Sequence, residues 1–225
     1  MKKKIITLLA FALFYAVRSF AQECSTAYYF SAKKEIIFNK YDKAGKYMGK
    51  DVGTISGIKQ ENGALQSTYR LIKYDAEGKV KEDGNAKIIC ENMNVRIGFQ
   101  VPDMESGQSK DAYFTYPAGM TSGQNLESKM ELKIKGKTNG KKMDVEFKVE
   151  NRKVIGREKV KTPAGDYDAV EIGYDMSIRF KVMGIGIPMK LKVLEWYSYG
   201  IGIVKTETYN KDGELQETSL LSSFK

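Results

Sequence analysis

D-A-V-E-I-G-Y-D-M-S-I-R-F-K-V, residues 168–182, is the stretch of sequence that decides the fold class. Its even positions from Val170 to Val182 are apolar or aromatic, whereas its odd positions from Glu171 to Lys181 are polar or glycine. Apolar side chains at every second position place one face of a β-strand in a core and the other face in water. An amphipathic helix would need apolar residues three and four apart. The stretch therefore predicts a long, half-buried β-strand.

Turn residues separate further alternating runs along the chain. Asn62-Gly63 and Asn139-Gly140 are typical of two-residue type I′ hairpin turns, because both residue types tolerate a positive φ. More reversals are expected at Glu77-Gly78, Asp83-Gly84, Asn151-Arg152, Ala164-Gly165 and Asp212-Gly213. The strands between these turns are expected at about 27–41, 52–60, 65–74, 79–90, 94–100, 129–138, 142–150, 153–162, 166–182, 189–199, 201–209 and 214–223.

Consecutive hairpins predict an antiparallel meander, and so many strands in one sheet must curl or split. We expect an all-β domain whose curved sheet forms an open or partly closed barrel. Two segments interrupt the alternation: 102–123, which is expected to be a long connection, and Met183–Met189. The glycines and the proline of the second segment predict that it does not pair as a regular central strand.

The first residues resemble an export signal. Lys2, Lys3 and Lys4 precede an apolar run over 5–17, and Ser19-Phe20-Ala21 places small residues where a signal peptidase would cleave. The run is about 13 residues long, whereas a spanning helix needs about 20. We therefore expect residues 1–21 to be a signal peptide and residues 22–225 to form one exported domain, periplasmic or secreted. An uncleaved membrane anchor is the weaker alternative.

The chain has two cysteines, Cys24 and Cys90. In an oxidising compartment they predict one disulfide, although two unpaired thiols remain the alternative because spacing does not show that their Cα atoms approach. Cys24 also follows the cleavage site closely, which raises the alternative of lipid attachment. Gln22 and Glu23 stand before it where that processing needs small residues, so lipidation is disfavoured.

Several local patterns together resemble a known family. They are Tyr28-Tyr29, residues 39–46 (N-K-Y-D-K-A-G-K), 154–160 (V-I-G-R-E-K-V), 162–169 (T-P-A-G-D-Y-D-A) and 196–205 (W-Y-S-Y-G-I-G-I-V-K). In their order and spacing they resemble the TapB-like family of exported envelope proteins, over most of the mature chain. The resemblance implies an all-β exported domain and implies no activity that can be assigned to residues.

The motifs of this resemblance have a structural interpretation. Pro163-Ala164-Gly165 suits a tight turn, because proline fixes φ and glycine takes the conformation that other residues avoid. Gly200 and Gly202 permit a bulge or a close backbone approach beside the indole of Trp196.

Catalytic chemistry has little support in this composition. The chain contains no histidine, which excludes Ser-His and Cys-His nucleophile activation and the commonest zinc ligand. No metal or cofactor is expected, and the protein is not expected to be an enzyme. A hydrolase that uses a pair of carboxylates is a distant alternative, with Asp166, Asp168, Glu171 and Asp175 as its candidates.

Two functional hypotheses follow. In the first, the protein is a non-catalytic binding module that holds a lipid-like ligand or an envelope protein. In the second, it is a structural or assembly protein that acts through strand edges and exposed aromatic side chains. The net charge of +9 falls once the basic leader is removed, and export makes nucleic acid an unlikely partner. No membrane-spanning segment is expected in the mature chain.

One segment is singled out as a contact site. The apolar side chains of 183–189 are expected to lie at a rim and to contact a ligand or partner, because methionine adapts to irregular apolar shapes. Aromatic residues of the long connection would form its other half. The candidate residues are Met183, Ile185, Ile187, Met189, Tyr113, Phe114 and Tyr116. Burial of the segment in the protein's own core is the alternative.

Overall fold

Twelve antiparallel strands form the part of the chain that the computed structural model describes, which is residues 24, 27–32, 35–100, 113–127, 130–138, 141–182 and 185–225. Residues 1–21, Asn139-Gly140 and Met183 lie outside the described residues. The elements are η1 (Tyr28–Phe30), β1 (Glu35–Asp42), β2 (Tyr47–Glu61), β3 (Ala64–Asp75), β4 (Val80–Glu91), β5 (Asn94–Gln100), β6 (Tyr113–Tyr116), β7 (Met130–Thr138), β8 (Lys141–Thr162), β9 (Gly165–Val182), β10 (Ile185–Ser198), β11 (Gly202–Asn210) and β12 (Leu215–Phe224).

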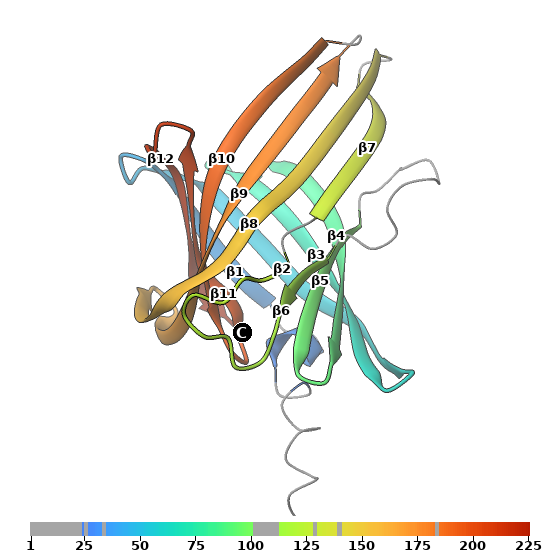
Figure 1. The fold of residues 1–225 in the computed structure, drawn as a ribbon, viewed down its shortest axis with the longest axis vertical. Helices are drawn as coiled ribbons and strands as arrows, with labels where there is room; N and C mark the ends of the chain where they lie inside the picture. Colours follow the sequence, from blue (N-terminus) through green and yellow to red (C-terminus); the bar gives the residue numbers. More distant parts are fainter. Residues whose placement is uncertain are drawn as a thin grey trace, which may run out of the picture.

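The strand order confirms the predicted all-β meander and its curvature. The order in the sheet is β6-β5-β4-β3-β2-β1-β12-β11-β10-β9-β8-β7, so each strand lies beside its neighbours in sequence and β1 pairs with β12. Figure 1 shows the sheet curled into a nearly closed barrel. In the described residues, no ladder joins the two end strands β6 and β7, and this gap is called the seam below.

The connection after β6 bridges the lower part of the seam. The backbone N–H groups of Gly123 and Leu126 each donate to β8, at Val154 O and Arg152 O, over 2.9 Å. Val154 returns a bond of 2.9 Å to Gln124 O, and Asn125 forms an isolated bridge with Lys153. The barrel is therefore closed on this side by a loop segment rather than by a full strand.

The prediction of a strand over 27–41 is wrong for its first residues, because β1 begins only at Glu35. Tyr28, Tyr29 and Phe30 form the turn η1, and all three side chains are buried. A strand alternates its faces, so it could not bury three consecutive aromatic rings, whereas a tight turn inserted into the end of the barrel can. These three residues are called the plug below. Figure 1 shows η1 in blue at the lower end of the barrel.

The reversal expected at Asn151-Arg152 is also wrong, because β8 continues through it. Asn151 takes a φ of 56°, and the register to β9 shifts between Glu150 and Lys153. The two residues form a β-bulge. Asn151 takes the left-handed conformation that it would also take in a turn, but here the strand bends and continues instead of ending. Asp83-Gly84 likewise lies inside β4. The reversals at Asn62-Gly63, with φ of 51° and 80°, and at the other described turns are confirmed.

From Ile185 to Met189 the segment pairs with β9 alone, so it belongs to a strand but, as predicted, not to a regular central one. β10 begins at Ile185, and Pro188 lies opposite Arg179 of β9. The ladder from β10 to β11 begins only at Leu191. At Pro188 the strand therefore has one neighbour, so the N–H group that proline lacks is not needed on the other side. A four-residue strand, β6, also replaces part of the connection expected over 102–123.

Candidate functional site

A cavity of about 660 Å³ lies inside the barrel. Its wall is mainly apolar and includes side chains from both halves of the sheet, and its size falls within the roughly 300–1,000 Å³ typical of small-molecule pockets. Aromatic residues of the wall include Tyr29, Phe38, Phe114, Tyr116, Phe147 and Tyr174. Tyr29 comes from η1, and alternation in the strands sends the other five side chains inward.

The plug closes the lower end of this cavity. Tyr28 donates its hydroxyl to Gly53 O over 3.1 Å, and Ser67 donates to Tyr29 O over 2.6 Å. Gly202 leaves room for the Tyr29 ring, since a Cβ atom there would lie 2.3 Å from the Tyr29 hydroxyl oxygen. The register shift between Trp196 and Tyr197, opposite Lys205 and Ile203, confirms the bulge expected beside the indole.

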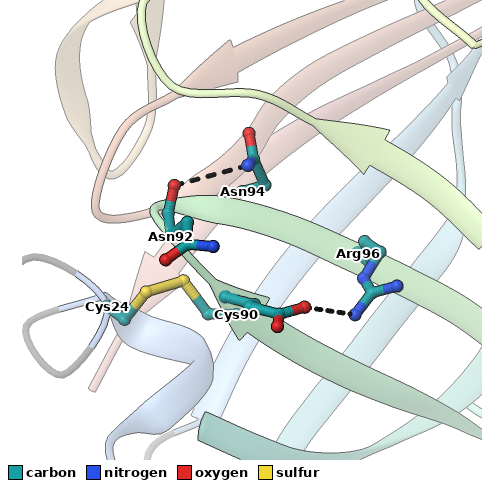
Figure 2. Close-up of a disulfide and its surroundings, with 6 residues drawn as sticks. Cys24, Cys90, Asn92, Asn94 and Arg96 are labelled. Carbon is teal, nitrogen blue, oxygen red and sulfur yellow. Dashed lines mark hydrogen bonds and ion pairs between the residues drawn. A yellow bond between two sulfur atoms is a disulfide. The ribbon is translucent and has the colours of Figure 1, made fainter. Parts of the chain in front are cut away.

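A disulfide joins the segment before the plug to the barrel wall. Cys24 and Cys90 are bonded, with their Cα atoms 6.0 Å apart and a sequence separation of 66. Figure 2 shows the bond at the end of β4, beside Asn92 of the following turn. The cross-link holds the chain that enters the barrel against the strand that forms its wall.

A buried carboxylate lies in the wall above the plug. Glu195 is 5% exposed and accepts hydrogen bonds from the hydroxyls of Tyr116, over 3.0 Å, and Tyr174, over 2.7 Å. Burial, and then the adjacent Glu195 charge, raise the pKa of both tyrosines well above the usual value. Both hydroxyls thus keep their protons and act as donors. The three residues connect β6, β9 and β10 across the interior.

Arg152 connects the bulge of β8 to β6 across the seam. Its side chain is 1% exposed, and one terminal nitrogen donates to Thr115 O over 2.6 Å. The guanidinium carbon lies 5.0 Å from the ring centre of Phe114 and 4.5 Å from that of Tyr116. Such contacts with aromatic faces stabilise a buried cation. The bulge thus supplies the residue that holds the edge strand β6 against the barrel.

Charged side chains gather at the opposite end of the cavity, on β1–β4 and β12, and this group is called the mouth below. Asp51, Lys73, Glu82 and Asp83 line the cavity there. Lys73 pairs with Glu82 over 2.6 Å, and Lys40 pairs with Glu217 over 2.9 Å. Burial raises the pKa of Asp51, while the charges of Lys40 and Lys73 act in the opposite direction. The cavity therefore has an apolar body and a charged mouth.

The structure separates the two halves of the contact site predicted from the sequence. Phe114 and Tyr116 are buried in β6 and line the cavity, whereas Tyr113, on the other face of β6, packs against Gly98 and Arg96. Met189 is 40% exposed in the β9–β10 hairpin. Figure 1 places the tip of this hairpin at the upper end and β6 in the lower half. The backbones of Ile185 and Ile187 belong to β10, and their side chains are outside the described part.

The carboxylates proposed for a hydrolase do not meet in the cavity. Asp166, Asp168 and Asp175 are exposed, and Asp175 accepts a bond of 2.7 Å from the Asn151 amide. Glu171 is half-buried, and burial, with a contribution from Glu158, raises its pKa. None of the four is among the described residues that line the cavity.

Two absences concern only the part of the chain that the structure describes. No three side chains of Asp, Glu, Cys or His come together there in a way that would hold a metal ion. Within the same ranges, no helix has the length and the apolar character needed to cross a membrane.

Comparison with known proteins places the chain in a family. A model of the DUF3108-like family matches residues 33–221. The chain belongs to this family. The match covers every described strand apart from the end of β12, so the barrel and its cavity belong to the DUF3108-like part of the chain. No curated protein matches the chain.

Two solved structures share the fold of this DUF3108-like protein. One is a candidate exported protein with a YmcC-like fold from Bacteroides fragilis, with a TM-score of 0.70 and 24% identity over 87% of this chain and 96% of that one. The other is a candidate lipoprotein from Parabacteroides distasonis, with a TM-score of 0.70 and 20% identity over the same shares, 87% and 96%. At these identities the likeness concerns the fold.

Proposed function

We propose that this protein is a non-catalytic binding module, exported from the cytoplasm, whose barrel holds a lipid-like ligand. The observation that carries the proposal is the cavity of about 660 Å³, with its apolar wall and its charged mouth. Ligand sites are usually concave and mostly apolar, with a few polar groups that fix the orientation of the ligand. A long apolar chain would lie against the aromatic wall, and a polar end would lie at the mouth.

The wall of the cavity continues beyond the mouth. Figure 1 shows β8, β9 and β10 extending at the upper end past β1–β4. Phe147 lines the cavity and pairs with Ile178, which pairs in turn with Met189, so the three side chains share one face. This face supports the prediction that Met189 contacts the ligand, as the outer end of a surface on which an apolar chain enters.

The interior acid favours a binding role over a catalytic one. Both carboxylate oxygens of Glu195 accept hydrogen bonds from tyrosines whose raised pKa keeps them protonated. An acid with both oxygens bonded in this way anchors strands, whereas a carboxylate-pair hydrolase needs two acids that are free to act on the same bond. The acids proposed for that role lie outside the cavity wall.

Export is supported by three observations. The leader has the charge and apolar pattern of a signal peptide, a disulfide is the bond of an oxidising compartment, and the two structural neighbours are described as a candidate exported protein and a candidate lipoprotein. Because Cys24 is bonded to Cys90, its sulfur is not available for a lipid. The mature chain would begin at Gln22, after the small residues of Ser19-Phe20-Ala21. An intact mass that includes residues 1–21, or a lipid adduct at Cys24, would overturn this assignment.

A role in assembly is the second candidate, favoured by the seam, where no ladder joins β6 to β7 among the described residues. Edge strands can accept a strand from another chain. Under this alternative the partner would be an envelope protein, and it would copurify after cross-linking.

The test is the recovery of ligand from the exported protein. Organic extraction of protein purified from its own cell envelope, followed by mass spectrometry, should release an amphiphile in a near-stoichiometric amount. The emptied protein should then bind a long-chain alcohol saturably in a calorimetric titration. No extracted molecule and no saturable binding would overturn the proposal. A stoichiometric cross-linked protein under the same conditions would instead favour assembly.

A further inference from the structure

An unpaired acid lies where the cavity meets its mouth. Asp51 projects from β2 into the cavity, and its Oδ1 atom is buried and accepts no hydrogen bond among the described residues. Buried polar atoms in native proteins nearly always have a partner, and each exception calls for an explanation such as a bound molecule. The other acid that lies deep in the cavity wall, Glu195, has both oxygens bonded to tyrosines.

The charged neighbours of Asp51 are engaged elsewhere. Lys73, its cross-strand partner on β3, pairs with Glu82 of β4 over 2.6 Å, and Lys40 of β1 pairs with Glu217 of β12 over 2.9 Å. Each lysine therefore already has a carboxylate, and Asp51 is the acid left over. An acceptor with a free oxygen matches a donor on a ligand, whereas the charge of each lysine is already balanced by a carboxylate.

We propose that the ligand is an amphiphile whose polar end donates a hydrogen bond, from a hydroxyl or an amine, to Asp51. The inference rests on the proposed function and names the chemistry of the ligand that the cavity would select. The apolar chain would run from Asp51 along the wall formed by Phe38, Phe147 and Met176, all of which line the cavity. Burial also raises the pKa of Asp51, as expected of an acid that lacks its partner.

The experiment compares four probes of equal chain length on the mature protein, emptied of ligand: a saturated alcohol, the corresponding amine, its methyl ether and its carboxylate. The alcohol and the amine should each bind at least about tenfold more tightly than the methyl ether, because a hydrogen bond to a charged acceptor is among the stronger ones. Asp51→Leu should reduce this preference to about twofold or less, the ratio left when chain burial alone drives binding.

Asp83→Leu is the matched control. Asp83 also lines the mouth, but both of its oxygens accept bonds from Arg70, over 3.0 and 2.6 Å. This variant should keep the preference for the donor probes. If Asp51→Leu does not fold, Asp51→Asn replaces it. The affinity for the amine should then fall at least about tenfold relative to the affinity for the ether, because the acceptor has lost its charge.

The outcomes separate this inference from the proposed function. If the wild-type protein binds none of the four probes, the apolar cavity is not a ligand site and the proposed function fails. Equal binding of alcohol, amine and ether would leave the proposed function standing and overturn the inference. Tighter binding of the carboxylate, lost in Lys73→Met, would also overturn it, because the lysines would then select an anion.

Discussion

Tyr174→Phe tests whether the buried acid holds the barrel together. The substitution removes one hydroxyl and leaves the ring in place. In the structure that hydroxyl donates to Glu195 over 2.7 Å inside the barrel, where Glu195 is 5% exposed. Hydrogen bonds to charged groups contribute about 1.5–3 kcal/mol, and a buried acceptor left unpaired is at the upper end of that range. We expect the free energy of unfolding to fall by about 2–3 kcal/mol.

Urea denaturation followed by the fluorescence of Trp196 measures this loss. The midpoint should fall while the slope of the free energy with urea stays unchanged, since the surface exposed on unfolding is the same. Tyr113→Phe is the control, because Tyr113 lies on the other face of β6 from Tyr116 and packs against Arg96, and its cost should stay within about 0.5 kcal/mol. A loss from Tyr174→Phe no larger than that of the control would refute the role assigned to Glu195.

Three further predictions concern pH, the disulfide and the plug. Burial raises the pKa of Tyr116 in the folded protein. Its contribution to stability is therefore complete below the pKa of tyrosine in the unfolded chain, about 10, and is lost as the pH rises above that value. A urea midpoint that is constant up to about pH 9 and then falls would show this loss. Reducing the Cys24–Cys90 bond should lower the free energy of unfolding by about 4 kcal/mol in the chain-entropy model. Stoichiometric thiol labelling of the unreduced protein would instead show that the bond does not form. Gly202→Ala should lower the free energy of unfolding by about 1–3 kcal/mol, because the residue has a φ of 103° and the added Cβ atom would meet the Tyr29 ring of the plug. Gly200→Ala is the control and should cost less, because Gly200 has a φ of 85° but open space around it. Equal losses of stability would contradict the contact between Gly202 and the plug.

The strands could be predicted because their burial pattern is local. Residues 168–182 alternate in sequence, and in the barrel Val170, Ile172 and Tyr174 are buried while Asp175 is exposed. Hairpin turns with Asn-Gly or Asp-Gly fix which strands are neighbours. The meander and its curvature follow from these two patterns, and the strand order confirms both.

The exceptions depend on contacts between distant segments. Asn151-Arg152 has the residue types of a turn, and only the contact of Arg152 with β6 shows that a bulge is needed there. Pro188 is accepted in β10 because β11 does not extend to it, which the local sequence does not reveal. The closure at the seam depends on the same kind of long-range contact.

The candidate site was predictable only in part. Glu195 did leave a signal, because it occupies an inward position of the alternating series Leu191, Val193, Glu195 and Tyr197, where an acid is unusual. Asp51 left none, since it directly preceded the strand expected at 52–60, where an acid is usually exposed. Its place at the mouth results from the longer course of β2, which pairs Asp51 with Lys73 of β3 and Phe38 of β1.

A cavity-filling pair of variants tests the binding role most directly. Gly84 lines the cavity, and a Cβ atom there would have no neighbour within 4 Å, so Gly84→Phe places a ring in the cavity without backbone strain. Gly156→Phe is the same change at a glycine with equally open space outside the cavity wall. In a titration with a long-chain alcohol, we expect Gly84→Phe to weaken binding by at least about tenfold, since the chain and the ring compete for one volume, and Gly156→Phe to bind as the wild type does. Unchanged binding by a folded Gly84→Phe variant would contradict the claim that the ligand lies inside the barrel.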